Sequence, residues 1–401
     1  MQEAASGAFR LVRGNPGFGL LLATRGVSFL GDGIALVALL VYIQQSSGTA
    51  TAVAAVLLVA DLVPALVAPG AGAAADRYHP RATLVVCETT QAILAILLSR
   101  LPSLGLMLAI VALMAGFAAA ARPAARRALV ALVPSEELPT ANAMFGTATN
   151  GLEAVAPLVA AVLFTVWGVG GILLVDAATF IVAAAMLTRL PTVAHSPMAQ
   201  GVRPEAVALS AGVRFIWSTP LVRAVALGFF ALVACTGVDD VALVVLAREN
   251  LSATEPAAAA LYAASGIGLA TGYLALTRFG RNYPTLRMLL SGFAVASLGN
   301  LLTGAAPGLA LVFACQAVRG IGVAVLDVAL NTFMLRDTPA HLHGRLFSTF
   351  YGLAGVGAAL AYLVGGPLVD AVGAPLAFMS AGTAGLLATA LTGLALHRVR
   401  E

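Results

Sequence analysis

The ten residues GAAADRYHPR, at positions 72–81, lie where two long apolar stretches meet, 51–75 and 82–100. A membrane-spanning helix needs about 20 mainly apolar residues. Each stretch is long enough to cross a bilayer, and the charged segment at their junction leaves room for only a tight turn. We therefore expect a pair of membrane helices joined by a short basic loop.

Long apolar stretches separated by short polar or charged segments continue along the whole chain. Of the 401 residues, 60% are hydrophobic and only 10% are charged, whereas a soluble protein has roughly 25% charged residues. Much of the surface must therefore face lipid. The sequence predicts twelve membrane helices, at residues 17–45, 51–75, 82–100, 103–121, 140–166, 169–189, 220–246, 255–277, 285–304, 308–335, 345–369 and 375–397.

One connection, residues 189–219, is longer than the others and rich in proline. It divides the predicted helices into six and six, so we expect one bundle over 1–188, a cytoplasmic linker over 189–219 and a second bundle over 220–401. Within the linker, apolar residues at helical spacing predict a short amphipathic surface helix over 205–217. A disordered hinge is the alternative.

A faint internal repeat relates the two halves. GYLALTRFGR at 272–281 begins 200 positions after GAAADRYHPR at 72–81, and each joins the second and third helices of its half. APLV at 156–159 has a counterpart in GPLV at 366–369. Similar halves with a cavity between them are a common transporter plan. The predicted fold is therefore an all-α membrane protein of two six-helix bundles related by a pseudo-two-fold axis.

The basic residues indicate the orientation. All 22 are arginine, which is typical of a GC-rich bacterial genome. If the N-terminus is cytoplasmic, 18 of the 22 arginines fall on the cytoplasmic side, whereas the outer segments hold only Arg100 and Arg248. Short cytoplasmic loops of membrane proteins carry such an excess of basic residues. We expect a multi-pass protein of the bacterial inner membrane with both termini in the cytoplasm.

Several functional classes find no support in the sequence. The three cysteines are far apart in apolar stretches, the five histidines lie at loops or helix ends, and there is no phosphate-binding loop. The arginines are spread over many short loops, which argues against a nucleic-acid partner. We therefore expect no enzyme activity, cofactor or metal. The expected partners are a small-molecule substrate, protons and membrane lipid, and the fold would work as a monomer.

The loop at 72–81 resembles the signature of the major facilitator superfamily. Gly72, Asp76, Arg77 and Arg81 match its glycine, aspartate and basic positions, while His79 stands where the family usually has a second glycine. The resemblance covers the whole chain and implies the twelve-helix transporter fold. It also implies a conformational lock made by Gly72, Asp76, Arg77 and Arg81.

In the family, the aspartate of this loop pairs with a nearby arginine and with the start of the eleventh helix. In this chain the partners would be Arg122 or Arg126 and the helix start near Gly344. The alternative is that these basic residues only orient the helices in the membrane.

Further segments resemble the bacterial exporters of siderophores and macrolides, a drug:proton antiporter branch. They are RGVSFLGD at 25–32, RPAAR at 122–126 and VPSEELPTANA at 133–143. The Gly-Pro and Gly-Gly pairs of the antiporter signature are here Ala156-Pro157 and Ala160-Ala161. Alanine still permits close helix packing, and Pro157 still bends the helix.

Charged residues inside the membrane are candidates for function, because each costs about 2.5–3.5 kcal/mol at a helix centre on insertion scales. Asp32 lies near the middle of the first predicted helix, and Arg25 shares its face seven residues earlier. Burial favours the uncharged form of a carboxyl group, so Asp32 is a candidate proton carrier. Pairing of each charge with a permanent partner is the alternative.

Four other charges are assigned to proton coupling or to a substrate cavity. Asp61 and Glu153 each lie just before a proline, and bonding to a backbone group freed by the kink is an equal alternative. Arg319 and Asp327 lie in the tenth predicted helix. A structural pair between Arg319 and an acid is equally possible.

The remaining intramembrane acids are expected near helix ends, where water reaches them: Glu88, Asp176, Asp239 and Asp240. Asp239 and Asp240 point about 100° apart on a helix, so at most one of them should face a cavity.

The resulting hypothesis is a secondary transporter that exports an amphipathic or apolar small molecule in exchange for protons, by alternating access to a central site. A proton-coupled importer of a metabolite and a lipid transporter on the same fold are the alternatives.

Overall fold

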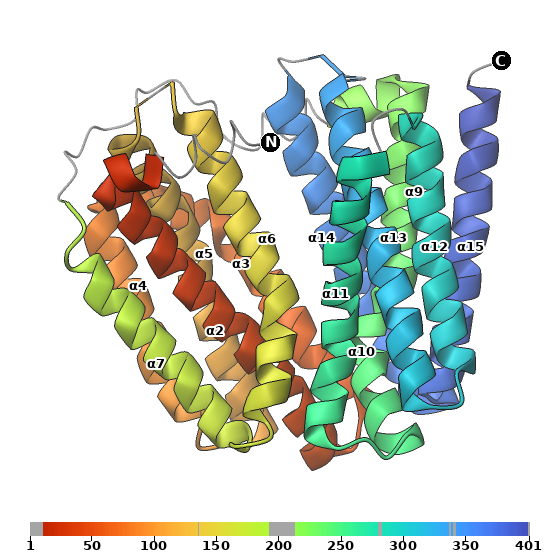
Figure 1. Cartoon of the computed structure of the whole chain (residues 1–401), viewed down its shortest axis with the longest axis horizontal. Coiled ribbons are helices and arrows are strands. Elements are labelled where there is room, and N and C mark those ends of the chain that lie inside the picture. Colours follow the sequence, from red (N-terminus) through yellow and green to blue (C-terminus); the bar gives the residue numbers. More distant parts are fainter. Residues whose placement is uncertain are drawn as a thin grey trace. The chain divides into compact units, whose positions relative to one another are not determined.

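The computed structural model describes residues 11–134, 136–191, 213–279, 283–336, 338–339 and 342–399. These residues are helices and short connections (Figure 1). The helices are α2 (Pro16–Ser47), α3 (Ala50–Arg77), α4 (Pro80–Leu98), α5 (Leu104–Leu132), α6 (Leu138–Leu163), α7 (Val169–Leu187), α9 (Pro220–Thr236), α10 (Val238–Val245), η1 (Leu246–Asn250), α11 (Glu255–Phe279), α12 (Thr285–Ala305), α13 (Leu309–Arg336), α14 (His343–Val372) and α15 (Ala374–Arg398).

Eleven segments in the described part of the chain are long and apolar enough to cross a membrane. One of them, Pro220–Asn250, comprises α9, α10 and the π-helical η1. The 26-residue α6 is a further long helix outside that set. Helices satisfy all their own backbone hydrogen bonds, which is why a chain this apolar folds into them. The predicted all-α membrane fold is confirmed.

Helices α5 and α3 extend into segments that were predicted to be loops. α5 continues through Pro123 to Leu132 instead of ending near 121, so Arg122 and Arg126 lie on a helix and not in a loop. α3 continues to Arg77, so most of the 72–81 segment is the last part of a helix. The prediction of loops was wrong here because charged residues at a membrane surface do not themselves break a helix.

The chain divides into two compact units. Unit 1 comprises Met1–Leu39 and Val59–Gly201, and unit 2 comprises Leu40–Leu58 and Val202–Glu401. The linker predicted over 189–219, with its surface helix over 205–217, falls largely outside the described residues, which resume at 213 as helix.

In unit 1, α4 packs against both α5 and α7. Large apolar side chains fill the space where α2, α4, α5 and α7 meet, among them Phe18, Leu84 and Leu187, each 0% exposed. α2 also approaches α6 closely, because a Cβ at Gly33 would lie 2.5 Å from the Cβ of Ala156. Small residues at such contacts let membrane helices approach one another.

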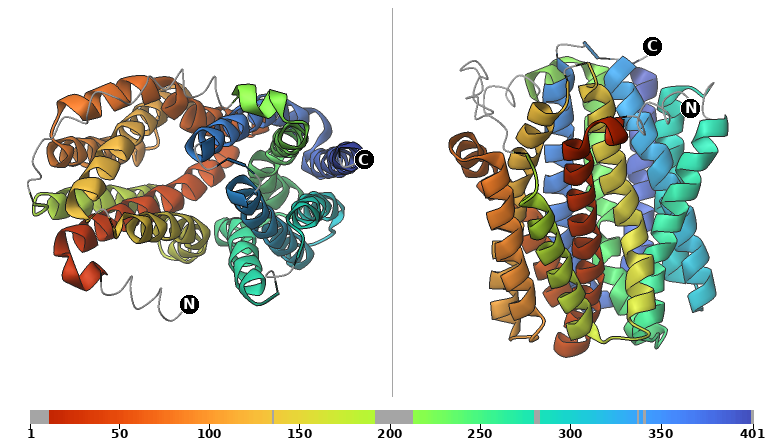
Figure 2. Two further views of the ribbon diagram at one scale, coloured as in Figure 1. Left: turned by 90° about the horizontal axis from the view of Figure 1, so that it is seen from above. Right: turned by 60° about the vertical axis from the view of Figure 1, so that its left-hand side comes forward.

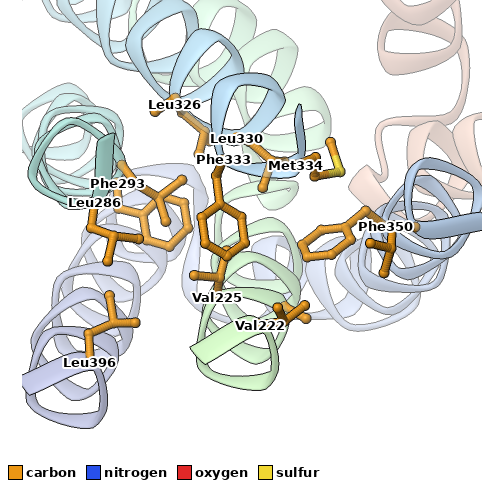
Figure 3. Close-up of a cluster of buried hydrophobic side chains, with 14 of the residues drawn as sticks. Val222, Val225, Leu286, Phe293, Leu326, Leu330, Phe333, Met334, Phe350 and Leu396 are labelled. Atoms are coloured by element: carbon orange, nitrogen blue, oxygen red, sulfur yellow. The ribbon is translucent and has the colours of Figure 1, made fainter. Parts of the chain in front are cut away.

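In unit 2, α13 packs against both α11 and α12, and α12 also packs against α15 (Figure 2). A Cβ at Gly320 would lie 2.1 Å from the backbone oxygen of Ser265, so only glycine allows this approach of α13 to α11. A buried apolar cluster that includes Phe293, Phe333 and Phe350 joins α12, α13 and α14 (Figure 3).

Unit 2 also contains the end of α2 and the start of α3, residues 40–58. Asp370 on α14 accepts hydrogen bonds from the backbone N–H groups of Ala50 (2.6 Å) and Thr51 (3.0 Å), and from the Thr51 hydroxyl (2.5 Å). Free N–H groups and the positive end of the helix dipole both favour a carboxylate at a helix start. Asp370 therefore caps α3 from another helix, and we call this contact the α3 cap.

Two side-chain hydrogen bonds lie close to the α3 cap in the sequence. The Gln44 amide donates to Glu249 Oε1 (2.6 Å), and the Gln45 amide donates to Glu255 Oε1 (2.9 Å). Gly48, with φ +64°, ends α2 in a conformation that favours glycine. The 40–58 segment is thus joined to unit 2 by polar contacts at several points.

Candidate functional site

The first polar group of unit 1 is a buried ion pair between α2 and α4. Arg25 Nη1 donates to Glu88 Oε1 at 2.6 Å, and the two side chains are 5% and 0% exposed. The Arg25 guanidinium also lies over the Phe29 ring, 4.8 Å from its centroid. Arg25 Nε and Glu88 Oε2 have no hydrogen-bond partner within the described structure. The ion pair therefore has no net charge, but two of its polar atoms lack hydrogen-bond partners.

A cavity of about 380 Å³ in unit 1 contains four polar side chains in a mainly apolar wall: Asp32 on α2, Gln91 on α4, Arg122 on α5 and Asp176 on α7. Asp32 is half-buried, and Arg25, Glu88 and Arg122 are close enough to act on its charge. A cavity of this kind suits an amphipathic guest, because isolated polar groups fix orientation while apolar walls supply contact area.

Asp176 is a buried acid whose carboxyl group makes no hydrogen bond in the described part of the chain. Its side chain is 1% exposed, and neither carboxyl oxygen has a hydrogen-bond partner there. The neighbouring Thr179 hydroxyl donates to the backbone oxygen of Asp176. Buried polar groups in proteins are nearly always bonded, so an unsatisfied carboxyl that lines a cavity is a candidate for binding a proton or a ligand.

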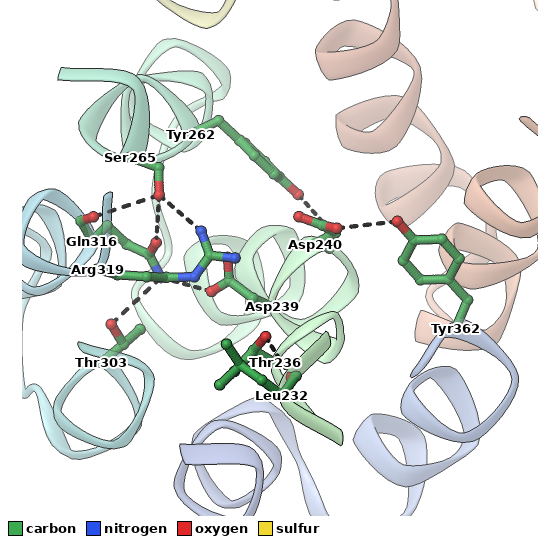
Figure 4. A network of polar contacts seen from close by, with 10 residues as sticks. All are labelled: Leu232, Thr236, Asp239, Asp240, Tyr262, Ser265, Thr303, Gln316, Arg319 and Tyr362. Atoms are coloured by element: carbon green, nitrogen blue, oxygen red, sulfur yellow. Dashed lines mark hydrogen bonds and ion pairs between the residues drawn. The ribbon is translucent and has the colours of Figure 1, made fainter. Parts of the chain in front are cut away.

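Unit 2 holds a second polar cluster, in which both oxygens of the acid Asp239 are bonded although Arg319 Nε has no hydrogen-bond partner within the described structure (Figure 4). Arg319 Nη2 lies 3.0 Å from Asp239 Oδ2, and the Gln316 amide donates to Asp239 Oδ1 at 2.8 Å. Arg319 Nη1 also contacts the Ser265 hydroxyl (3.1 Å), which in turn lies 3.1 Å from Gln316 Oε1. Both oxygens of Asp239 are therefore engaged in a network that joins α10, α11 and α13.

A cavity of about 290 Å³ lies beside this network in unit 2. Its polar residues include Asp240, Arg319 and Asp327, and its apolar wall includes Phe350 and Tyr351. The Tyr362 hydroxyl donates to Asp240 Oδ2 at 3.1 Å (Figure 4). Asp240 lines this cavity, whereas its neighbour Asp239 is 3% exposed and does not.

Asp327 of the same cavity is held by two side chains. The Tyr273 hydroxyl donates to Asp327 Oδ2 (2.9 Å), and the Asn331 amide donates to Asp327 Oδ1 (3.0 Å). Its carboxylate is therefore fixed in place while it remains half-buried at the cavity wall. Arg319 and Asp327, both predicted from the sequence, lie together at this cavity.

The described residues contain no group of three or more His, Cys, Asp or Glu side chains that could hold a metal ion. The described linings of the two cavities present carboxyl groups, arginines and apolar walls. With its long apolar helices, the chain is suited to moving a guest across a membrane.

Comparison with known proteins decides the family. The sequence model described as Major Facilitator Superfamily matches residues 21–239 and 238–401. The chain belongs to the major facilitator superfamily. It is therefore a multi-pass membrane transporter, and the resemblance drawn from Gly72, Asp76, Arg77 and Arg81 is confirmed at the level of the family.

Two curated relatives of this facilitator cover nearly its full length. The multidrug efflux pump Tap of Mycolicibacterium fortuitum is 27% identical over 393 residues, which is 92% of this chain and 93% of that protein. The uncharacterized MFS-type transporter YfiS of Bacillus subtilis (strain 168) is 22% identical over 384 residues, 93% of this chain and 91% of that protein.

Solved structures confirm the facilitator fold. A POT family transporter in complex with 5-aminolevulinic acid matches with a TM-score of 0.75 at 13% identity, over 96% of this chain and 97% of that chain. The nucleoside transporter NupG matches with a TM-score of 0.71 at 14% identity, over 96% of this chain and 98% of that chain. At sequence identities this low, the similarity is evidence for a shared fold and for nothing beyond it.

The predicted lock residues of this facilitator can be placed only in part. Arg77, Arg122 and Arg126 are exposed, and Arg122 lines the unit 1 cavity. Arg81 donates to the backbone oxygen of Thr188 near the end of α7. Gly72 and Asp76 lie in the last turns of α3, and the side chain of Asp76 falls outside the described residues.

Of the two acids predicted beside prolines, only Asp61 has a side chain that the structure describes. Asp61 is exposed on α3 and is not part of the unit 1 cavity, although its neighbours Ala60 and Pro64 line it. Glu153 lies in α6, and its side chain falls outside the described residues. Asp32 and Arg25 come close in unit 1, but Arg25 is paired with Glu88.

The sequence prediction was wrong about four acids expected near helix ends. Glu88 and Asp176 lie in the middle of α4 and α7 with 0% and 1% exposure, and Asp239 and Asp240 lie midway along the Pro220–Asn250 span. Glu88 lies well inside its predicted stretch, 82–100, and this position could have indicated burial. The partners Arg25 and Arg319 could not have been identified, because they come from distant helices.

Proposed function

We propose that this facilitator exports an amphipathic or apolar small molecule in exchange for protons, in a bacterial inner membrane with both termini in the cytoplasm. The observation that supports this most is the unit 1 cavity, where Asp32 and Asp176 lie in a mainly apolar wall. A carboxyl in such surroundings can bind and release a proton as its exposure changes. The similarity to the multidrug efflux pump Tap favours export over import.

In this proposal the two cavities have different tasks. The unit 1 cavity couples transport to protons through Asp32, and the unit 2 cavity binds part of the substrate through Asp327 and the aromatic wall of Phe350 and Tyr351. Arg319 is fixed by Asp239 and sets the local charge. Asp61 and Glu153 are second-rank candidates for adjusting the charge of Asp32.

The segment around Asp76 is proposed to hold one conformation of the transport cycle. Its basic neighbours Arg77 and Arg81 lie at the end of α3 and the start of α4, where a change of contacts can act on both helices. Asp76→Asn is expected to change the rate of transport without abolishing substrate binding, since the task proposed for Asp76, in the last turn of α3, is to hold a conformation and not to bind substrate.

The deciding experiment uses purified protein in liposomes with an imposed proton gradient and a dye panel that includes ethidium. Wild type is expected to move dye across the membrane in the direction opposite to proton flow. Asp32→Asn is expected to lose this movement while still binding dye. Glu255→Gln serves as control, because this acid pairs with Gln45 and lines neither cavity. If wild type moves dye equally well with and without the proton gradient, exchange for protons is contradicted. If no dye moves at all, a metabolite importer or a lipid transporter becomes the better hypothesis.

A further inference from the structure

The unit 1 cavity contains one acid whose role is not explained by pairing. Asp176 is 1% exposed, lines the cavity and has no hydrogen-bond partner for either carboxyl oxygen within the described structure. Burial removes the hydration of Asp176, and the neighbouring Thr179 hydroxyl donates to its backbone oxygen, so an ionised Asp176 is disfavoured unless a cation balances its charge. The neutral, protonated acid avoids that cost.

The geometry brings Asp176 next to Asp32. Gly31, which precedes Asp32 on α2, lies so near α7 that a Cβ at this glycine would be 2.6 Å from Oδ1 of Asp176. The side chains of Asp32 and Asp176 line the same cavity and act on each other electrostatically. Two carboxyl groups that share a low-dielectric site do not ionise independently.

The charges around the pair can be counted. On α2 and α4, Arg25 and Glu88 neutralise one another at 2.6 Å. Cys87 on α4 is a buried, uncharged thiol beside them. Among the described residues that line the cavity, the charged ones are then Asp32, Asp176 and, on α5, Arg122, while Asp61 on α3 is exposed and outside the lining. With both acids ionised this set has a formal charge of −1, and a single proton brings it to zero.

We infer that Asp32 and Asp176 hold one exchangeable proton between them, while Arg122 balances the second carboxylate. The proton leaves an oxygen of Asp176 for an oxygen of Asp32, which is half-buried at the cavity wall and therefore open to exchange with solvent. Asp176 stores the proton, and Asp32 exchanges it. That the pair is the coupling group of transport rests on the proposed proton-driven export.

Infrared spectroscopy of the purified wild-type protein tests this inference, because the protonated carboxyl group has its own absorption band. The spectra of Asp32→Asn, Asp176→Asn and the double variant are compared with wild type at neutral pH. Each single variant is expected to lose the signal of one carboxyl, since the remaining acid is then balanced by Arg122 and ionises. The double variant is expected to lose no more than either single variant.

Two other outcomes would overturn the shared proton. If Asp32→Asn leaves the band unchanged, Asp176 holds its proton alone. If the losses of the single variants add in the double variant, the two acids are independent. A wild-type band that appears only when sodium is replaced by choline would mean that the pair holds a sodium ion instead.

Arg122→Gln gives a signal in the opposite direction, which misfolding does not imitate. Without the balancing cation both acids need a proton, so the band should grow by one carboxyl equivalent. Glu255→Gln, outside the cavity, should leave the band unchanged. An unchanged band in Arg122→Gln contradicts the charge count.

The spectra require no transported compound, so the inference and the proposed function can fail separately. A shared proton without gradient-driven transport would remove proton-coupled export but keep the pair. Gradient-driven transport in a protein that lacks the band would keep the export and remove the pair.

Discussion

The two units of this facilitator treat buried charge in different ways. In unit 2, both oxygens of Asp239 are engaged, one by Arg319 and one by Gln316. In unit 1, Glu88 uses one oxygen for Arg25 and leaves the other without a partner in the described structure, and Asp176 uses neither. The same type of residue is thus a fixed structural element in one unit and an open binding position in the other.

The difference shows where chemistry can occur. A fully bonded carboxylate is held in its ionised form by its donors, so protonating it would cost those bonds. An unbonded buried carboxyl has no such restraint, and a small change in its surroundings changes whether it holds a proton. This difference is the basis for proposing a structural role for the unit 2 network and proton exchange for the unit 1 cavity.

The largest effect is expected when the unit 2 pair is broken on one side. Arg319→Leu leaves the Asp239 charge buried without its cation, and removal of one partner of a buried pair typically costs about 3–5 kcal/mol. The free energy of unfolding, measured by titration with SDS, should fall by that order. A variant as stable as wild type would mean that Asp239 is already neutral in the protein.

Removing both partners sharpens the comparison. Asp239→Leu with Arg319→Leu deprives Gln316 and Ser265 of bonds that they make now, whereas Arg25→Leu with Glu88→Leu removes a pair that is incompletely satisfied. A buried polar group that loses its partner costs about 1–3 kcal/mol. The unit 2 double variant should therefore be less stable than the unit 1 double variant by about that amount. If SDS titration shows that both double variants lose the same free energy of unfolding, the hydrogen bonding of the buried charges does not distinguish the two units.

A smaller or similar effect is expected from helix packing. Gly320→Ala places a Cβ about where the backbone oxygen of Ser265 lies, at 2.1 Å, whereas the nearest atom to a Cβ at Gly116 in unit 1 is 4.0 Å away. Overpacking a close contact costs about 1–3 kcal/mol. Melting temperatures in detergent should fall for Gly320→Ala and stay near wild type for Gly116→Ala. The reverse order would place the tighter helix contact in unit 1.

The smallest effect is expected at the α3 cap. Asp370→Ala removes the acceptor for the N–H groups of Ala50 and Thr51, and loss of a helix cap costs about 0.5–2 kcal/mol. Asp370→Asn keeps one acceptor oxygen and should lose less. Unfolding by SDS distinguishes these two variants, and an identical loss in both would show that charge, and not the hydrogen bond, stabilises the cap.

The sequence predicted the helices well, because apolar stretches of about 20 residues leave the backbone no alternative in lipid. The positions of helix ends were predicted less accurately, since Pro123 lies inside α5 and not after it. Asp32 could be proposed as a candidate from the sequence because it is an isolated acid in a long apolar helix, and the structure places it at a cavity. Asp176 could not be proposed in this way, since its place at the cavity depends on how α2 and α4 pack around it. The ion pairs join residues 63 and 80 positions apart, Arg25 with Glu88 and Arg319 with Asp239, and no local pattern encodes such contacts.

The α3 cap has a consequence for how the chain can vary in evolution. Asp370 contacts mainly backbone N–H groups, and every amino acid except proline supplies one. For the two backbone hydrogen bonds, positions 50 and 51 need only avoid proline, while position 370 must keep a short side chain that ends in an acceptor. Selection on these two bonds therefore acts mainly on one residue of α14, whereas the burial of Ala50 and the hydroxyl bond of Thr51 restrict the start of α3 for separate reasons.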